Sequence, residues 1–287
     1  DQRLRLQFRN EGGTVEAALG AFRVGGKLGL DQTIFAEDFA YLKSAAPAGT
    51  VPKLTIPSPS MLHYRGGRAA IDAQVYPDMA EFWADLAQVY AQEIAALHGL
   101  GCTYLQLDDT SLAYLNDPAQ RAYVDGIGGD GASQHLTNIR IINAALKDRP
   151  AGMTVCIHMC RGNFRSSWMA EGGYDHVAEA LFGGLDVDGF FLEYDDARSG
   201  GFAPLRFVPR GKKRVVLGLV TSKRAALEAK DDLKRRIDEA AKYVPLKQLC
   251  LSPQCGFSST VDGNALSIEQ EKAKLRLVVE VARDVWG

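Results

Sequence analysis

Short apolar runs alternate along the chain with stretches in which apolar positions recur every three or four residues. The apolar runs begin near residues 53, 103, 154, 189, 215 and 248, and each is short enough to form a buried strand. Between two of them, Asp78 and Glu81 form a capping-box pattern, and helical spacing then continues to Leu97. This alternation of strand and helix predicts a parallel sheet with crossover helices.

Other segments carry weaker signals. Residues 1–30 alternate only weakly, which predicts a ragged hairpin or an extended segment. Residues 109–132 are rich in glycine and predict a long functional loop, and residues 194–213 predict an irregular one. Further helices are expected over 36–45, 133–147 and 227–244, and from a second capping box, Ser267 with Gln270, to about residue 285. Because no internal repeat or low-complexity tract is visible, we expect one domain over residues 1–287.

The composition is that of an ordinary globular protein. The chain has 287 residues, of which 46% are hydrophobic and 24% charged, with a net charge of −2. A nearly neutral chain without basic runs argues against nucleic acid or a membrane surface as a partner. No apolar stretch reaches the roughly 18 residues of a membrane span, and the first residues do not resemble a signal peptide. Five scattered cysteines fit a reducing compartment, so we expect a cytoplasmic protein.

One apolar strand carries a candidate metal-binding pair. Side chains alternate between the two faces of a strand, so Cys156, His158 and Cys160 share one face. His158 and Cys160 then lie about 6.6 Å apart along the backbone, a span that two ligands can close around one ion. By itself, such a pair more often marks a core histidine beside small buried cysteines.

Two later strands end in further ligand types. Glu193 ends the apolar run that begins near residue 189, and Cys255 follows the run that begins near residue 248. In a (β/α)₈ barrel the strand ends converge on one face, and the intervals along the chain correspond to about one and three βα units. One nitrogen, two sulfurs and one carboxylate oxygen form a ligand set that suits zinc. Cys102, Cys156 and Cys250 are expected to be core residues.

Three motifs together resemble a known family. His-Met-Cys-Arg-Gly-Asn-Phe at 158–164, Phe-Leu-Glu-Tyr-Asp at 191–195 and Ser-Pro-Gln-Cys-Gly-Phe at 252–257 are similar to the catalytic half of the cobalamin-independent methionine synthases. In that family a His-x-Cys pair, a glutamate and a late cysteine bind a zinc that activates the thiolate of homocysteine. The resemblance therefore implies a Zn²⁺ site with these ligands: His158, Cys160, Glu193 and Cys255.

The resemblance also implies a (β/α)₈ barrel of the TIM type. A closed barrel needs eight strands, whereas six apolar runs are visible from about Pro52 onward. We therefore expect that the first one or two βα units, roughly 60–80 residues, lie before Asp1.

Several further residues are candidates for substrate contact. Asp108, in Gln-Leu-Asp-Asp at 106–109, resembles the family's aspartate that holds the amino group of homocysteine; a turn aspartate is the alternative, and Asp109 is the poorer candidate. Ser58 and Tyr64 could line the pocket of the alkyl donor, with surface-loop chemistry equally plausible. Arg161, followed by Asn163, could clamp a carboxylate, phosphate or sulfonate, although a solvated loop arginine is nearly as plausible.

The chain departs from the full-length synthases after the strand expected near residue 215, which corresponds to the seventh strand of the family's barrel. Those enzymes place a histidine there that protonates the departing folate, whereas this chain has Val-Thr-Ser-Lys at 220–223, so Lys223 is the candidate acid or anion-binding group. Asp195, Asp196 and Arg198, beside Glu193, could orient the ligands or form a local salt bridge. The remaining histidines, His63, His98, His135 and His176, have no partner at ligand spacing and are expected to be structural. The resemblance is to the short, single-barrel branch of the family.

These observations lead to three hypotheses. The first is a zinc-dependent methyltransferase that methylates the thiol of homocysteine to give methionine, with 5-methyltetrahydrofolate, another folate or a different compound as methyl donor. The second keeps the zinc but alkylates another small thiol, such as the addition of an epoxide to coenzyme M. The third is a binding protein with a structural zinc, because four protein ligands also describe closed structural sites.

Overall fold

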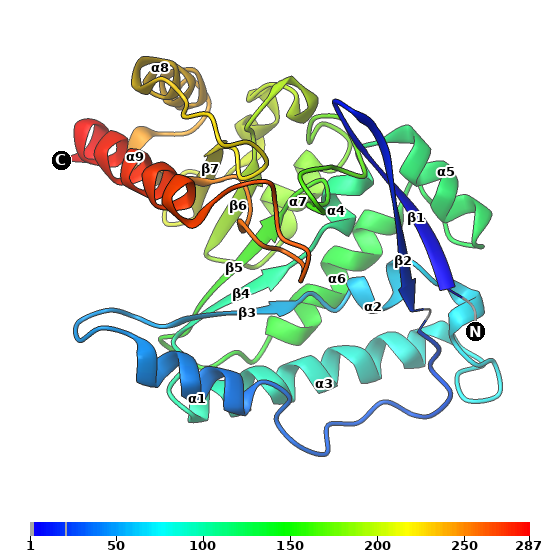
Figure 1. The fold of residues 1–287 in the computed structure, drawn as a ribbon. Helices are drawn as coiled ribbons and strands as arrows, with labels where there is room; N and C mark the ends of the chain where they lie inside the picture. The colour runs from blue at the N-terminus through cyan, green and yellow to red at the C-terminus, as the bar shows by residue number, and fades with distance from the viewer. Residues whose placement is uncertain (1–2, 21) are drawn as a thin grey trace.

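The computed structural model describes residues 3–20 and 22–287 and is built around one parallel sheet (Figure 1). Its six strands are hydrogen-bonded in chain order, β3-β4-β5-β6-β7-β8. Their bounds are β3 Lys53–Pro57, β4 Tyr104–Asp108, β5 Thr154–Met159, β6 Gly189–Glu193, β7 Arg214–Val220 and β8 Leu249–Pro253. The six strands and their parallel pairing confirm the predicted α/β fold.

Helices connect the strands and cover the sheet. The α-helices are α1 Ala36–Ala45, α2 Met61–Tyr64, α3 Met79–Gly99, α4 Ser111–Tyr114, α5 Pro118–Gly126, α6 Gln134–Leu146, α7 Ala178–Gly184, α8 Lys230–Ala241 and α9 Ile268–Trp286. Short 3₁₀ helices are η1 Arg68–Ala70, η2 Ala197–Ser199, η3 Ala203–Phe207 and η4 Leu246–Gln248. The Ser267–Gln270 capping box opens α9 as predicted, and the Asp78 side chain caps α3 while Glu81 pairs with Lys27. No helix of the described part of the chain is long and apolar enough to cross a membrane.

The two faces of the sheet differ in chemistry. On β4 and β5, Leu105, Leu107, Val155 and Ile157 are fully buried in the main apolar core, together with side chains of α3, α6 and α7. The alternate positions face the other side of the sheet and carry polar groups, and His158 is the last of these on β5. The period of two along each strand therefore places the candidate ligands on the face away from the helices.

The described residues form an open arc of a barrel rather than a closed one. Strands β3 and β8 each pair with one neighbour only, within residues 3–20 and 22–287. This arrangement agrees with the expected TIM-type barrel as far as the six strands go.

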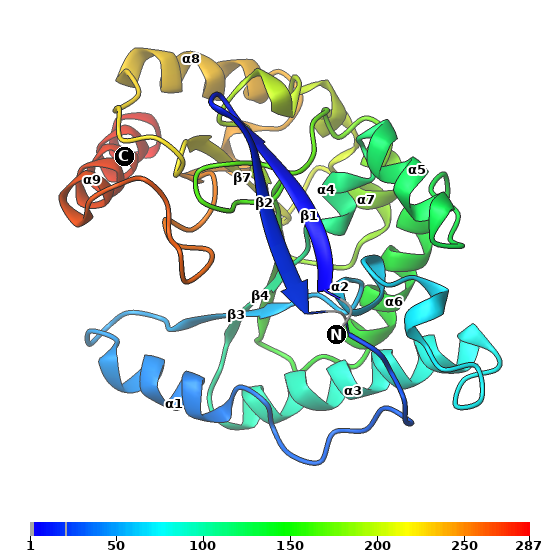
Figure 2. The ribbon, with the colours of Figure 1, turned by 45° about the vertical axis from the view of Figure 1, so that its right-hand side comes forward.

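A β-hairpin lies over the loop that follows β5 (Figure 2). Strands β1 (Arg3–Asn10) and β2 (Gly13–Gly20) pair antiparallel, which confirms the expected hairpin. The backbones of Arg9 and Trp168 exchange hydrogen bonds of 2.7 and 2.8 Å, and the rings of Phe8 and Phe164 lie 5.1 Å apart. The hairpin is thereby joined to the segment that carries Cys160.

Two expectations about connections need correction. The long loop predicted for residues 109–132 is wrong, because this segment contains α4 and α5; Asp117 caps α5 and Pro118 occupies its first turn. The helix expected over 227–244 is shorter and covers Lys230–Ala241. The irregular segment expected over 194–213 is confirmed, with only η2 and η3 in it.

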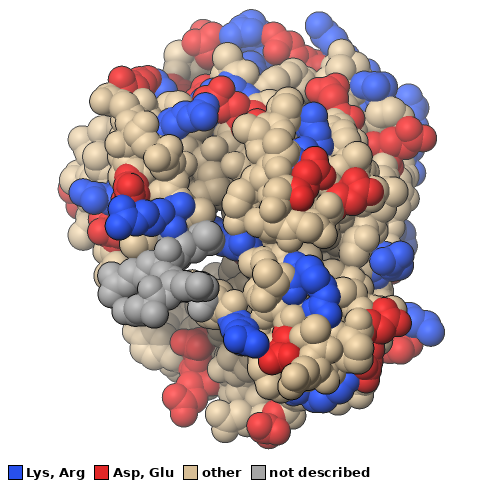
Figure 3. All heavy atoms as spheres, turned by 90° about the vertical axis from the view of Figure 1, so that its right-hand side faces the viewer, with Lys and Arg blue, Asp and Glu red and all other residues tan. Residues whose placement is uncertain are grey.

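The surface carries both signs of charge. On the face shown in Figure 3, lysine and arginine side chains are interspersed with aspartate and glutamate. This mixture agrees with the net charge of −2 and gives that face no extended area of one sign.

Candidate metal centre

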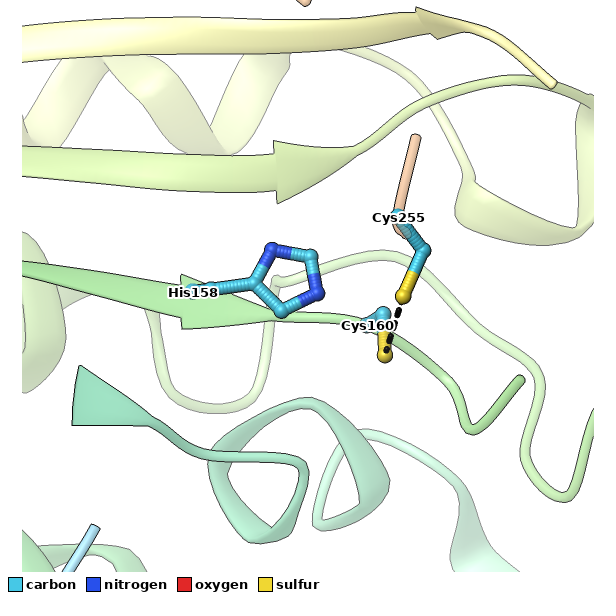
Figure 4. Close-up of side chains that lie close together, drawn as sticks. All are labelled: His158, Cys160 and Cys255. Atoms are coloured by element: carbon cyan, nitrogen blue, oxygen red, sulfur yellow. Dashed lines mark hydrogen bonds between the residues drawn. The ribbon is translucent and has the colours of Figure 1, made fainter. Parts of the chain in front are cut away.

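Three predicted ligands from two distant parts of the chain meet at the carboxyl ends of the strands (Figure 4). One donor atom each of His158, Cys160 and Cys255 lies within 4.8 Å of the others. His158 is the second-last residue of β5, Cys160 follows that strand, and Cys255 follows β8. The parallel strands bring these residues together because their carboxyl ends meet at one edge of the sheet.

The distances within this cluster fit a tetrahedral zinc ion. The Sγ atoms of Cys160 and Cys255 lie 3.8 Å apart. Two thiolates at Zn–S distances near 2.3 Å and a tetrahedral angle are separated by roughly 3.8 Å. In addition, His158 Nε2 is buried and has no hydrogen-bond partner among the described residues. A buried nitrogen without a partner beside two close sulfurs is the arrangement that a soft cation satisfies.

The cluster already favours a thiolate. The hydrogen bond between Cys255 and Cys160, together with the His158 imidazole, holds the pKa of Cys255 well below its ordinary value in spite of burial. The same hydrogen bond, with burial, raises the pKa of Cys160. Burial disfavours a charged imidazole, but Cys255 and Asp108 outweigh it and raise the pKa of His158 to about 9. The three groups thus share protons that a metal ion would displace.

Glu193, the fourth predicted ligand, lies beside the cluster but is bound to other groups. Its side chain is fully buried, and Oε2 accepts a 2.5 Å hydrogen bond from the backbone N–H of Arg161. Oε1 accepts from Lys223 Nζ at 3.1 Å and lies 3.5 Å from Arg198 Nη2. Although burial acts in the opposite direction, these cations lower the pKa of Glu193 to about 2. Its role as a metal ligand stays a prediction.

Lys223 is a buried ion-pair partner in this structure. Its Nζ lies 3.1 Å from Glu193 Oε1 and 3.1 Å from Asp195 Oδ2. Burial alone would lower the pKa of Lys223, but the two carboxylates outweigh burial and raise it. A lysine that holds its proton more firmly is a poorer acid, and the expected role of Lys223 in protonating a leaving group stays a prediction.

Asp108 lies next to the cluster because of strand register. It pairs with His158 across β4 and β5, and its Oδ1 is 3.8 Å from His158 Nε2. The side chain is 46% exposed, and partial burial raises the pKa of its carboxyl against the opposing effect of His158. Asp108 therefore presents a carboxylate to the space beside the candidate metal ligands.

Asp109 points into the protein instead. It is fully buried and accepts hydrogen bonds from the Ser60 hydroxyl, from Ser111 Oγ at 2.7 Å and from the Leu112 backbone N–H at 3.0 Å. These bonds fix the turn after β4, which agrees with its place as the poorer candidate for substrate contact.

The structure does not bring Ser58 and Tyr64 into the cluster. Ser58 is fully buried, with Oγ 3.1 Å from Ser60 Oγ, and so belongs to the hydrogen bonds around Asp109. Tyr64 is buried against Tyr114 and donates from its hydroxyl to Gln120 Oε1 at 3.1 Å. The loop after β3 turns these side chains inward, and their expected contact with a methyl donor stays a prediction.

Arg161 is held by groups of the protein itself. It is fully buried, and its guanidinium donates to the carbonyl of Gly172 at 2.6 and 2.8 Å and to that of Glu193 at 3.2 Å. The group also lies 4.6 Å from the centre of the Tyr174 ring. These contacts give Arg161 a structural role, and its expected contact with an anionic substrate stays a prediction.

Asn163 ties the two ligand-bearing loops together. Its Nδ2 donates to the Gly256 carbonyl at 2.9 Å and to Ser259 Oγ at 3.1 Å, and its Oδ1 accepts from Asn264 Nδ2 at 3.0 Å. These bonds fix the Cys255 loop against the Cys160 loop. Asn163 thus has a positioning role, its expected contact with substrate stays a prediction, and Asn264 is a partner that no sequence pattern indicated.

Trp168 is another residue that the sequence did not single out. The Arg198 guanidinium lies 4.0 Å from the centre of its ring, and the Trp168 backbone pairs with Arg9 of the hairpin. This contact links the hairpin, the Cys160 loop and the charged groups around Glu193. A lone tryptophan in a loop gives no sequence signal for such a role.

The comparisons with known proteins agree with this geometry. Residues 64–284 match the family described as the cobalamin-independent synthase, catalytic domain. An uncharacterized Bacillus subtilis protein, YxjH, is 49% identical over 98% of this chain and 72% of its own length. A methionine synthase of Pyrococcus abyssi is 25% identical over 64% of this chain and 45% of its own length.

A solved structure supports the same relationship. The crystal structure of a putative vitamin-B12-independent methionine synthase from Listeria monocytogenes superposes on this chain with a TM-score of 0.75 and 44% identity. The superposition includes 91% of this chain and 72% of the Listeria chain. The family and its structural relatives support a methyltransferase of the methionine synthase type. By its family match, its relatives and its sheet, the chain belongs to the catalytic-domain family of the cobalamin-independent synthases.

Proposed function

We propose that the protein is a zinc-dependent methyltransferase that moves a methyl group to the thiol of homocysteine and so produces methionine. The methyl donor is 5-methyltetrahydrofolate or another small methylated compound. The observation that carries this proposal is the cluster of His158, Cys160 and Cys255 with the Asp108 carboxylate 3.8 Å from the imidazole.

The ligand set supports a thiol-activating metal. His158, Cys160 and Cys255 would hold Zn²⁺, with Glu193 as the proposed fourth ligand, and three strong donors leave a tetrahedral ion one position for exchange. Zinc bound in this way supplies a positive charge that removes the proton of a coordinated thiol, whose ordinary pKa near 8.5 leaves it mostly protonated at neutral pH. Two cysteinates keep the site rich in electrons, which favours alkylation of sulfur over formation of hydroxide.

The chain's own residues would orient an amino thiol. The half-exposed carboxylate of Asp108 would bind the ammonium group of homocysteine. The sulfur of homocysteine would then lie toward Cys160 and Cys255. Asn163 holds the two ligand loops in place. Because β4 and β5 are paired at Asp108 and His158, the amine-binding group and the metal ligands are held at a constant separation.

The alternative reaction, alkylation of an acidic thiol such as coenzyme M, receives less support. It needs a basic residue for the sulfonate, and both candidates, Arg161 and Lys223, are buried and bound to protein acceptors. A closed structural zinc is the third possibility, and the coordination experiment below separates it from the first.

Zinc content and zinc-edge X-ray absorption, each with and without homocysteine, test the proposal. We expect about one zinc per chain with two sulfur ligands, and a third sulfur once homocysteine is added. A protein without zinc, or a coordination shell that homocysteine leaves unchanged, would contradict the proposed function.

Asp108→Asn tests the orientation of the substrate. It should weaken homocysteine binding about tenfold to hundredfold, the range for one hydrogen bond to a charged group, without loss of zinc. Asp188→Asn is a matched control, since that aspartate is similarly exposed but precedes β6 at the far end of the sheet, where it pairs with Arg149. Equal homocysteine affinity in the Asp108→Asn and unchanged proteins would remove Asp108 from the site.

A further inference from the structure

A buried lysine contacts the carboxylate that is proposed as the fourth ligand. Lys223 Nζ lies 3.1 Å from Glu193 Oε1 and 3.1 Å from Asp195 Oδ2. The lysine side chain is 3% exposed, and both carboxylates are buried. A cation held in this way does not reach a solute, so its effect must be on the carboxylates it contacts.

The two oxygens of Glu193 face different partners. Oε2 accepts from the backbone N–H of Arg161, the residue that directly follows Cys160, whereas Oε1 faces Lys223. The carboxylate therefore lies between the loop that carries a metal ligand and a fixed ammonium group. A bound metal and Lys223 would compete for the same anionic group.

The cations around Glu193 have other acceptors as well. Three acids and three bases form a charge-balanced cluster: Glu193, Asp195 and Asp196 with Arg161, Lys223 and Arg198. If Glu193 turned toward a metal, Lys223 would keep Asp195, and Arg198 would keep Asp196 at 2.6 Å. Removing one partner of a buried ion pair is costly because it leaves an uncompensated charge. Lys223 and Arg198 would each keep an acid, and Arg161 would keep its hydrogen bonds to the carbonyls of Gly172 and Glu193, so the carboxylate can change partner without leaving Lys223 or Arg198 unpaired.

We propose that Lys223 is a positioning residue that competes with the bound metal for Glu193 and thereby keeps this carboxylate an exchangeable ligand. The inference rests on the proposed function, because exchange at the fourth position matters where a substrate thiol must reach the metal. Without Lys223, Glu193 would be retained by the metal, and the centre would resemble a closed structural site with four protein ligands.

The test compares Lys223→Met with the unchanged protein, each loaded with zinc or cobalt(II). Without any thiol, zinc affinity measured against a chelator should rise about tenfold to hundredfold in Lys223→Met, since Glu193 loses one charged hydrogen-bond partner. With homocysteine added, the sulfur-to-metal absorption of the cobalt(II) form should become more intense in the unchanged protein, because a third sulfur joins the two cysteines. In Lys223→Met this change should require about tenfold more homocysteine.

A double-mutant cycle separates this effect from the loss of a nearby positive charge. In the Glu193→Gln background, Lys223→Met should no longer raise zinc affinity, because the competing carboxylate is absent. Lys274→Met is a matched control: Lys274 is also fully buried and lies 3.1 Å from Glu228, but it contacts none of the candidate ligands, and zinc affinity should not change.

Clear results would overturn the inference. Zinc affinity that is equal in Lys223→Met and the unchanged protein, or a gain that persists in the Glu193→Gln background, would show that Lys223 does not compete for Glu193. If Lys223→Met does not fold, the double variant Lys223→Met with Asp195→Asn can be used, because it also removes the charge of the acid that loses its lysine partner. The zinc affinity of the double variant is then compared with that of Asp195→Asn alone. Failure of the proposed function is separate, since it would appear as a cobalt(II) spectrum of the unchanged protein that homocysteine does not alter.

Discussion

The Sγ atoms of Cys160 and Cys255 lie 3.8 Å apart although 95 residues separate them along the chain. One follows β5 and the other follows β8, and the hydrogen bonds from Asn163 to Gly256 and Ser259 hold their loops together. The pair is thus set by two strands and one asparagine rather than by a local motif.

Replacing either cysteine should abolish tight metal binding. Cys160→Ser or Cys255→Ser removes one of three clustered donors, and we expect zinc affinity to fall by at least about a hundredfold. Competition with a chelator and metal analysis of the purified protein would measure this. Cys156→Ser is the matched control, because this buried thiol lies on the same strand face but outside the cluster. Retention of full zinc affinity by Cys160→Ser would exclude the candidate centre.

Arg161 should matter for stability rather than for substrate binding. Arg161→Met leaves the Gly172 and Glu193 carbonyls and the Glu193 carboxylate without their buried cation, so the free energy of unfolding should fall by about 3–5 kcal/mol. Urea denaturation measures the change. Arg206→Met is the control, since this arginine is more exposed and bonds only to the Ala203 carbonyl, and the loss there should be below about 1 kcal/mol. A stable Arg161→Met protein with weakened thiol binding would restore the substrate role.

Gly218 of β7 packs tightly against the backbone of the segments that carry Glu193 and Cys255. A Cβ at this position would lie 2.7 Å from the Leu192 carbonyl oxygen and 2.9 Å from Gln254 Cα, both of which are backbone atoms. Gly218→Ala should therefore lower the free energy of unfolding by about 1–3 kcal/mol and weaken zinc binding, because Gln254 precedes Cys255.

Gly183→Ala provides the comparison for this variant. A Cβ at Gly183 would meet nothing within 4 Å, and the residue lies in α7, so alanine there should raise stability by about 0.5–1 kcal/mol. Thermal unfolding of the two variants, with zinc titration, would measure both effects. Equal stability of both variants would contradict the close packing at Gly218.

The strands and the clustering of three candidate ligands, His158, Cys160 and Cys255, could be predicted from sequence because each depends on a short local pattern. An apolar run of five or six residues that ends in histidine, glutamate or cysteine indicates both the strand and the side chain at its end. The partners of buried polar groups could not be predicted in this way. Arg161 and Asn163 follow Cys160 directly, but what they contact depends on Gly172, about ten residues later, and on Gly256, which is 93 residues away.

Two other features of the connecting segments could not be predicted from sequence alone. Glycines in residues 109–132 predict a loop, whereas Asp117 and Pro118 supply the start of α5. For Lys223 the sequence signal is only the absence of a family histidine, and its two carboxylate partners lie 28 and 30 residues earlier in the chain.

His63 should make stability depend on pH. It is buried against the edge of the Trp83 ring, and burial, with the nearby Arg68, lowers the pKa of His63 from 6.5 to about 4. Because the pKa is lower in the folded state, the unfolded chain binds the extra proton first. The stability from a neutral His63, about 3 kcal/mol, is present above about pH 6.5 and lost as the pH falls toward 4.

Urea denaturation between pH 7 and pH 4 would measure this dependence. His63→Leu removes the titrating group, so its free energy of unfolding should fall less steeply over that range. Parallel pH profiles for the two proteins would show that His63 does not contribute.

The pairing of Asp108 with His158 has a consequence for how this site can diversify. The two residues are opposite each other in a ladder of backbone hydrogen bonds between β4 and β5, so the separation of Asp108 from His158 does not depend on loop length. The segment that follows β4, which carries α4 and α5, can therefore gain or lose residues while that separation is kept. Under the proposed function, acceptance of new methyl donors would evolve in that segment while Asp108 and His158 stay in place.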